Sequence, residues 1–75
     1  MIMPSKHLSP RQSLLGVSGI VLTHLERPHT VTGLWNKVQN VDEVRSFEQF
    51  ALAVDLLYAM GALDIRDGFV HKIAS

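Results

Sequence analysis

The chain has 75 residues, its seven basic and seven acidic side chains give a formal net charge of zero, and it has no cysteine. This length fits one small domain and leaves no room for a second. The absence of cysteine excludes disulfides and thiolate metal sites and fits a reducing compartment. The balanced charge excludes a global field that would draw the chain to nucleic acid or to an anionic membrane.

No targeting signal is apparent at the start of the chain. The opening MIMPSKHLSP has a proline and a histidine where a signal peptide has an unbroken apolar segment. The longest apolar run, LLGVSGIVL, is far shorter than the roughly 20 residues that span a bilayer. We therefore expect a soluble cytoplasmic protein. Lys6 and Arg11 precede the first acid, Glu26, which indicates either a basic arm or, as we favour, a solvated tail.

The first predicted helix begins at Ser9 and Pro10, because serine caps helix starts and a proline in the first turn has no N–H to satisfy. The apolar residues at helical spacing are Leu14, Val17, Val21 and Leu25, with Leu15 and Leu22 beside them. Pro28 disfavours helical geometry in the residue before it, so we expect the helix to end near Arg27.

One side of this helix is unusual because of its glycines. One line along it contains Ser13, Gly16, Ile20 and Thr23, and Gly19 is adjacent to this line. A glycine in a helix interior costs roughly 1 kcal/mol relative to alanine, so close backbone contact is a plausible compensation. We favour packing against another helix of the domain, and contact with a partner is the alternative.

A short second helix is predicted next, with Thr30 or Thr32 as its cap and Asn40 at its end. Its apolar face consists of Leu34, Trp35 and Val38. Trp35 is the only tryptophan, and an anchor in the core with its indole N–H near the surface is favoured over a binding role.

The third predicted helix has the strongest pattern. Ser46 and Gln49 have the spacing of a capping box, and Gly61 is suited to a left-handed C-terminal cap. Its apolar stripe consists of Phe47, Phe50, Ala51, Val54, Leu57 and Tyr58, while Leu52, Leu56 and Ala59 fall outside the stripe. We expect Val54 and Leu57 to be core residues.

A β-hairpin is predicted around Asp67-Gly68, since both residues tolerate the positive φ of a type I′ turn. The pairs expected across the hairpin are Arg66 with Phe69, Ile65 with Val70, Asp64 with His71 and Leu63 with Lys72. Leu63, Ile65 and Val70 then face the core, and the outer face has Asp64, Arg66, Phe69 and His71.

The predicted fold class is therefore mainly α with a C-terminal β-hairpin, in the order of a winged helix-turn-helix domain with three helices and a wing. We assign residues 9–75 to this single domain and residues 1–8 to an N-terminal tail.

Several segments resemble one known family. MPSKH, SLLGVSGIVL, TVTGLW and FEQFALAVDLLYAMGALDI followed by DG are similar to the small middle component of ABC-three-component systems, of the type called middle component 6. The resemblance implies a winged-helix protein encoded beside a chromosome-maintenance-type ATPase and an effector. Such systems are regarded as bacterial conflict or phage-defence modules, with the middle component as an adaptor.

The histidines do not form a convincing metal site. They are His7, His24, His29 and His71. Zinc needs three or four converging ligands, and one helical face cannot present both His24 and His29 because Pro28 lies between them. Dispersed surface histidines are favoured.

Catalytic patterns are also weak. The two glycines of the first helix lack the Gly-Lys-Ser/Thr that follows in a phosphate-binding loop. Nothing indicates a base or an oxyanion hole for Ser18 or Ser46, and Asp42-Glu43 fits solvated charge in a polar connector. We expect no enzyme activity, no cofactor and no metal.

Two function classes remain, a protein–protein adaptor and a DNA-binding transcriptional regulator. DNA binding needs lysine and arginine for phosphates and polar side chains for base edges. The third helix offers only Gln49 for such work, and its acids Glu48 and Asp55 oppose it; Arg66 and Lys72 of the wing are offset by acids.

We therefore favour an adaptor and expect no specific duplex binding. The residues expected to bind the partner are Leu52, Leu56, Met60, Arg66 and Phe69. The partner is expected to be the ATPase, the effector or a second copy of the chain, and no membrane is involved.

Overall fold

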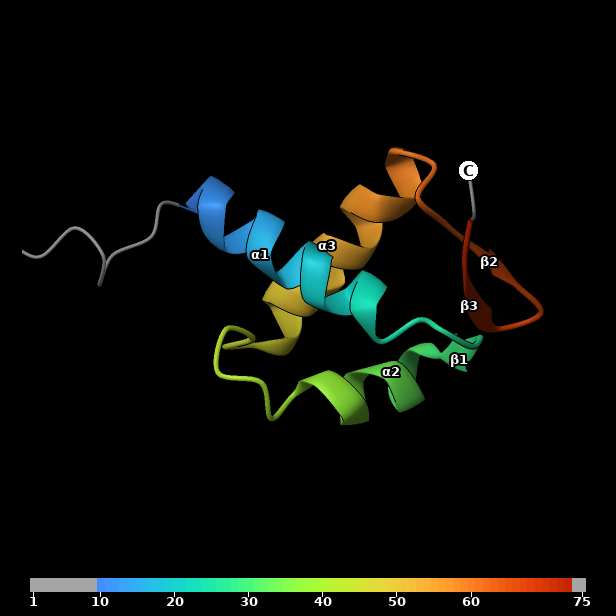
Figure 1. Ribbon diagram of the computed structural model, residues 1–75, viewed down its shortest axis with the longest axis horizontal. Coiled ribbons are helices and arrows are strands. Elements are labelled where there is room, and N and C mark those ends of the chain that lie inside the picture. Colours follow the sequence, from blue (N-terminus) through green and yellow to red (C-terminus); the bar gives the residue numbers. More distant parts are fainter. Residues whose placement is uncertain (1–9, 74–75) are drawn as a thin grey trace, which may run out of the picture.

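The computed structural model describes residues 10–73 and places three helices ahead of a small antiparallel sheet (Figure 1). In chain order the elements are α1 (Pro10–Thr23), β1 (His29–Thr30), α2 (Val31–Val38), α3 (Phe47–Ala59), β2 (Leu63–Arg66) and β3 (Phe69–Lys72). The strand order is β1-β3-β2, so the C-terminal hairpin receives a third strand from the segment before α2. This is the arrangement of a winged helix, and it confirms the predicted fold class.

Some expectations fall outside the described residues. The predicted tail, residues 1–8, lies there together with Lys6, His7 and the cap Ser9, and the side chain of Arg11 is not described either. The boundary between tail and domain and the choice between a basic arm and a solvated tail therefore stay predictions.

The core lies between the helices and the inner face of the sheet. Its buried apolar side chains are Val17, Val21, Leu25, Leu34, Val38, Val44, Phe50, Ala53, Val54, Leu57, Leu63 and Val70. Burying one side chain of the Val, Leu or Phe type contributes roughly 1.5–3 kcal/mol, so this cluster is the main source of stability in a chain without cysteine. The predicted core positions Val54, Leu57 and Leu63 are confirmed.

Three aromatic rings join α2 to the start of α3. The Trp35 ring centroid lies 5.4 Å from that of Phe50 and 5.3 Å from that of Phe47, the latter in an edge-to-face arrangement. Phe50 is fully buried and Trp35 is half-buried against the core. Such pairs add about 0.5–1.5 kcal/mol beyond the area that they bury. Trp35 thus packs as the predicted anchor.

The predicted caps of α2 and α3 form, with one change of detail. Thr30, not Thr32, caps α2, and its hydroxyl accepts a bond of 3.0 Å from the Gly33 N–H. At α3, Ser46 Oγ accepts from the Gln49 N–H at 3.1 Å, whereas Gln49 Oε1 accepts from the Arg45 N–H at 2.8 Å. The Gln49 side chain therefore reaches one residue further back than the capping box requires.

Helix α1 ends at Thr23, four residues before the end predicted near Arg27. Its last carbonyls are taken up locally, because Thr23 Oγ1 donates to Gly19 O and His24 Nδ1 donates to Ile20 O, both at 2.9 Å. Because the helix ends at Thr23, the following loop places Leu25 in the core and leads to β1.

The hairpin has the predicted register at all four pairs, from Leu63–Lys72 to Arg66–Phe69. Asp67 and Gly68 have φ of 52° and 81°, as the two-residue turn requires. Gly61 ends α3 with φ of 78°, as predicted. Strand β1 has no counterpart in the sequence-based prediction, because two residues are too few to show an alternating pattern.

Ile65 departs from its predicted place in the core. It pairs with Val70 and so shares the inner face of the sheet, but 44% of its surface is exposed. The end of the hairpin projects beyond the helical layer, so the core ends before Ile65 is covered (Figure 1).

The apolar stripe of α3 is also narrower than predicted. Phe47 and Tyr58 are exposed, Ala51 is only half-buried, and the buried side chains are Phe50, Ala53, Val54 and Leu57. Phe47 stands at the start of the thirteen-residue helix and Tyr58 near its end.

The close packing expected at the glycines of α1 is wrong. A Cβ built on Gly16 or Gly19 would meet no heavy atom within 4 Å, and both residues are exposed. On this line of α1, Ser13 does contact α3, because its hydroxyl accepts a hydrogen bond from Gln49 Nε2. The glycine side of α1 faces open space, which leaves contact with a partner as its untested alternative.

Candidate interaction surface

The outward face of α3 combines one large apolar side chain with two carboxylates. Glu48, Leu52, Asp55 and Ala59 follow one another at spacings of four, three and four residues, and all four are exposed. Residues at these spacings lie on the same side of a helix. Leu52 is 58% exposed and lies between the two acidic side chains. The face therefore offers an apolar contact flanked by negative charge.

The other two predicted site residues of α3 lie beside this face. Met60, which caps the helix, is 66% exposed, whereas Leu56 is half-buried. Leu56 stands seven residues after Gln49, whose amide bonds to Ser13 of α1, so this flank of α3 faces α1. Partial cover by α1 explains the reduced exposure of Leu56.

Arg66 and Phe69 form a cross-strand pair next to the hairpin turn, on its outer face. Phe69 is 44% exposed. Arg66 Nε lies 3.0 Å from Asp64 Oδ2 in an exposed ion pair. The pKa of the Asp64 carboxyl lies below its usual value, first because Arg66 donates this hydrogen bond and second because the Ile65 N–H donates to Oδ1. The positive charge of Arg66 is thus partly balanced.

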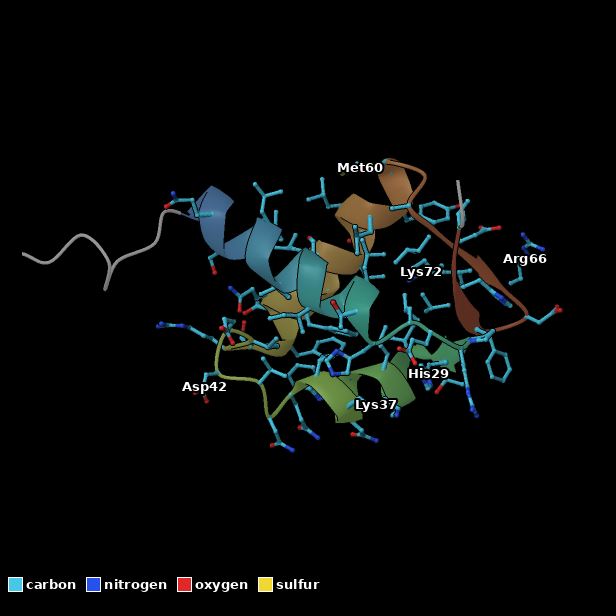
Figure 2. All side chains as sticks on the ribbon, in the orientation of Figure 1. His29, Lys37, Asp42, Met60, Arg66 and Lys72 are labelled. Carbon is cyan, nitrogen blue, oxygen red and sulfur yellow. The ribbon has the colours of Figure 1, made fainter. Side chains whose placement is uncertain are left out.

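The structure separates the predicted site residues into two groups. Leu52, Leu56 and Met60 follow the edge of α3, while Arg66 and Phe69 lie at the hairpin turn. Figure 2 shows Met60 near the end of α3 and Arg66 well away from it, beside the hairpin.

Other exposed apolar residues were not assigned to the site from the sequence. They are Leu15, Phe47, Tyr58, Ile65 and Ile73. Ile73 continues the hairpin, since its N–H donates to the Ala62 carbonyl at 3.0 Å. This hydrogen bond lies beyond the ends of β2 and β3, and the sequence pattern does not predict it.

The Gln49 side chain forms two hydrogen bonds within the domain. Its Nε2 donates to Ser13 Oγ and its Oε1 accepts from the Arg45 N–H. The only side chain of α3 that suited base readout is therefore held by structural hydrogen bonds, which the sequence did not reveal because Ser13 is 36 residues away.

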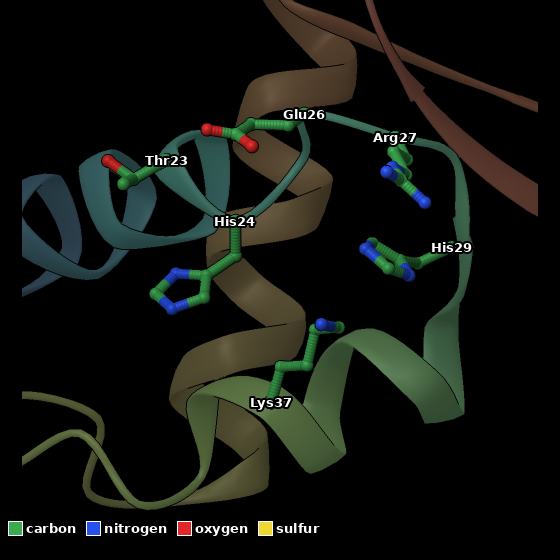
Figure 3. A pocket seen from close by; sticks show the side chains of 6 residues that line it. All are labelled: Thr23, His24, Glu26, Arg27, His29 and Lys37. Atoms are coloured by element: carbon green, nitrogen blue, oxygen red, sulfur yellow. The ribbon is translucent and has the colours of Figure 1, made fainter.

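A second feature is a polar hollow of about 380 Å³ near the end of α1 (Figure 3). Its lining residues are Thr23, His24, Glu26, Arg27, His29 and Lys37. The fold thus brings His24 and His29 to one hollow, although they could not share a helical face. Within residues 10–73, no group of three or more His, Cys, Asp and Glu side chains could hold a metal ion.

Comparison with known proteins identifies the family. Residues 3–73 match the family model described as ABC-three component (ABC-3C) system Middle Component 6. The chain belongs to this family. No curated protein and no solved structure matches it.

A Middle Component 6 protein is one part of an ABC-3C defence system and works alongside other subunits. The family description assigns no catalytic role to the middle component. In the part of the chain that the structure describes, no helix is both long and apolar enough to cross a membrane.

Proposed function

We propose that this middle component is a non-catalytic adaptor that docks on another component of its system through the outward face of α3 and the wing. The observation that carries the proposal is Leu52, a large apolar side chain exposed between Glu48 and Asp55 on the helix that enters the major groove in DNA-binding helix-turn-helix proteins. Exposed apolar groups that gather on a small domain indicate an interaction surface.

The chemistry of this face disfavours DNA as the ligand. Two carboxylates on the outward face would repel phosphates, whose neutralisation by lysine and arginine provides most of the affinity for DNA. Gln49 is held by Ser13 and Arg45, and Arg66 is paired with Asp64. The face suits a protein surface that has an apolar pocket for Leu52 and basic side chains around it.

The wing adds a second point of attachment. Phe69 is an exposed aromatic ring on the hairpin, and aromatic side chains that become buried on binding often dominate binding energy at protein interfaces. Ile73, just after β3, and Ile65, on the inner face of the hairpin, are also exposed. The two groups of residues would then contact different parts of one larger partner. In line with the family resemblance, we propose that this partner is the ATPase or the effector of the same system.

The test is co-purification of the chain with the ATPase and the effector encoded beside it. Leu52→Asp and Phe69→Ala should each reduce the recovered partner severalfold, because one places a charge in the apolar contact and the other removes the anchor. Leu15→Asp is the matched control, since Leu15 is an exposed leucine on a different helix.

Thermal unfolding of each variant separates loss of binding from loss of folding. If folded Leu52→Asp and Phe69→Ala proteins both recover the partner at the wild-type yield, the docking proposal is wrong. Equal losses in all three variants would show that a general apolar effect, rather than this face, governs recovery.

A further inference from the structure

Three basic side chains from three separate elements converge in the hollow near the end of α1. Arg27 comes from the loop after α1, His29 from β1 and Lys37 from α2. Figure 3 shows all three pointing toward one another across the hollow, while the Glu26 carboxylate turns back toward Thr23. The sequence does not predict this meeting, because pairing of β1 with β3 fixes the position of His29.

Positive charge exceeds negative charge in this hollow, because Arg27 and Lys37 face a single lining carboxylate, Glu26. Among the described side chains, Arg66 and Asp64 form an ion pair, whereas Arg27 and Lys37 form none. Bringing like charges together is unfavourable unless an anion or solvent compensates them.

The arrangement of donors selects among anions. Arginine, lysine and histidine can each donate hydrogen bonds from a different side of the hollow, and arginine can do so with two parallel N–H groups. A carboxylate or a phosphodiester of a nucleic-acid backbone presents two free oxygens, whereas a terminal phosphate presents three and carries more negative charge. The three-sided set of donors fits the terminal phosphate best.

We propose that this hollow binds a terminal phosphate group, with Arg27, His29 and Lys37 as its ligands. The group is either free phosphate or the phosphate of a nucleotide, because both present the same three oxygens. The residues that line this site differ from those of the docking surface on α3 and the wing, so the site would give the domain a second ligand in addition to its protein partner.

The proposal is tested on the full chain by two-dimensional ¹H–¹⁵N NMR titrations at constant ionic strength. The ligands are AMP, inorganic phosphate, cyclic AMP and adenosine. AMP should give saturable shifts centred on Arg27, His29 and Lys37, and cyclic AMP and adenosine should bind at least several times more weakly. Comparing AMP with inorganic phosphate shows whether the nucleoside adds affinity.

Charge-removing variants test the ligands directly. Arg27→Gln and Lys37→Gln should each raise the Kd for AMP roughly tenfold or more, the scale expected for loss of one charged hydrogen bond. Arg45→Gln removes an exposed arginine that does not line the hollow and should leave this Kd unchanged. All three positions are exposed, and the spectra show whether each variant is folded.

Several results would overturn the proposal. They are the absence of saturable shifts with AMP, equal binding of cyclic AMP, and equal weakening by Arg45→Gln, which would indicate non-specific attraction. Binding of a phosphate-free acidic peptide as tightly as AMP would assign the hollow to carboxylates of a partner protein instead.

Discussion

On the outward face of α3, Glu48 and Asp55 flank an exposed leucine, whereas in the hollow near the end of α1 Arg27 and Lys37 converge without ion-pair partners. The whole chain has a formal net charge of zero, so this separation does not appear in its composition. The comparison shows that a neutral small domain can present an acidic, apolar surface and a basic, polar one. Each surface is suited to a different class of ligand.

The largest effect is expected for substitutions that compare the buried side of α3 with its exposed side. Leu57 is buried, and Leu57→Ala should destabilise the domain by about 2–5 kcal/mol through lost burial and a cavity. Leu52→Ala removes the same atoms from the exposed side and should change stability by about 0.5 kcal/mol or less. Thermal or urea unfolding measures both. Retention of the wild-type transition by Leu57→Ala would show that the packing of α3 is misassigned.

The second prediction concerns the acidic face and DNA. The isolated wild-type chain should show no sequence-specific duplex binding at physiological salt, because the outward face of α3 is negative. The double variant Glu48→Lys, Asp55→Lys should gain weak, sequence-independent binding that disappears as salt is added. Fluorescence anisotropy measures both proteins. Nanomolar, sequence-dependent binding by the wild type would favour a DNA-binding regulator over the adaptor.

A smaller effect is expected at the open side of α1. Gly16→Ala and Gly19→Ala should each stabilise the domain by about 0.4–1 kcal/mol, because the added Cβ meets no atom and restricts the unfolded chain. Gly61→Ala is the contrasting control, since its φ of 78° makes a side chain unfavourable and the substitution should destabilise. Destabilisation by both α1 variants would contradict the open environment of these glycines.

The smallest effect concerns the ion pair of the wing. Because the folded-state pKa of Asp64 is lowered, the contribution of its pair with Arg66 is present above the unfolded pKa of roughly 3.9 and is lost as pH falls through the folded value. A ¹³C NMR titration of the carboxyl should show this lowered midpoint in the wild type. In Arg66→Gln the midpoint should move up toward the ordinary value, and an unchanged midpoint would show that the pair does not form in solution.

Local patterns were enough to predict much of the fold. The Ser46 cap, the left-handed Gly61 and the four-pair hairpin register depend on residues close together in the chain, and all three are confirmed. The buried Val54 and Leu57 follow from helical periodicity in the same way. Sequence reasoning succeeded here because the interactions that select these features are local or periodic.

The sequence by itself determined the presence of the three helices, the wing and the acidic character of α3. These features follow from the spacing of apolar residues and from the chemistry of individual side chains, which do not depend on tertiary contacts. Tertiary structure alone decided which side chains are covered and which are exposed. It leaves Ile65 exposed at the end of the hairpin, and it brings Gln49 into hydrogen-bonding distance of Ser13. It also brings His29 beside Arg27 and Lys37 through the two-residue strand β1. These outcomes depend on contacts between distant segments, which no local pattern encodes.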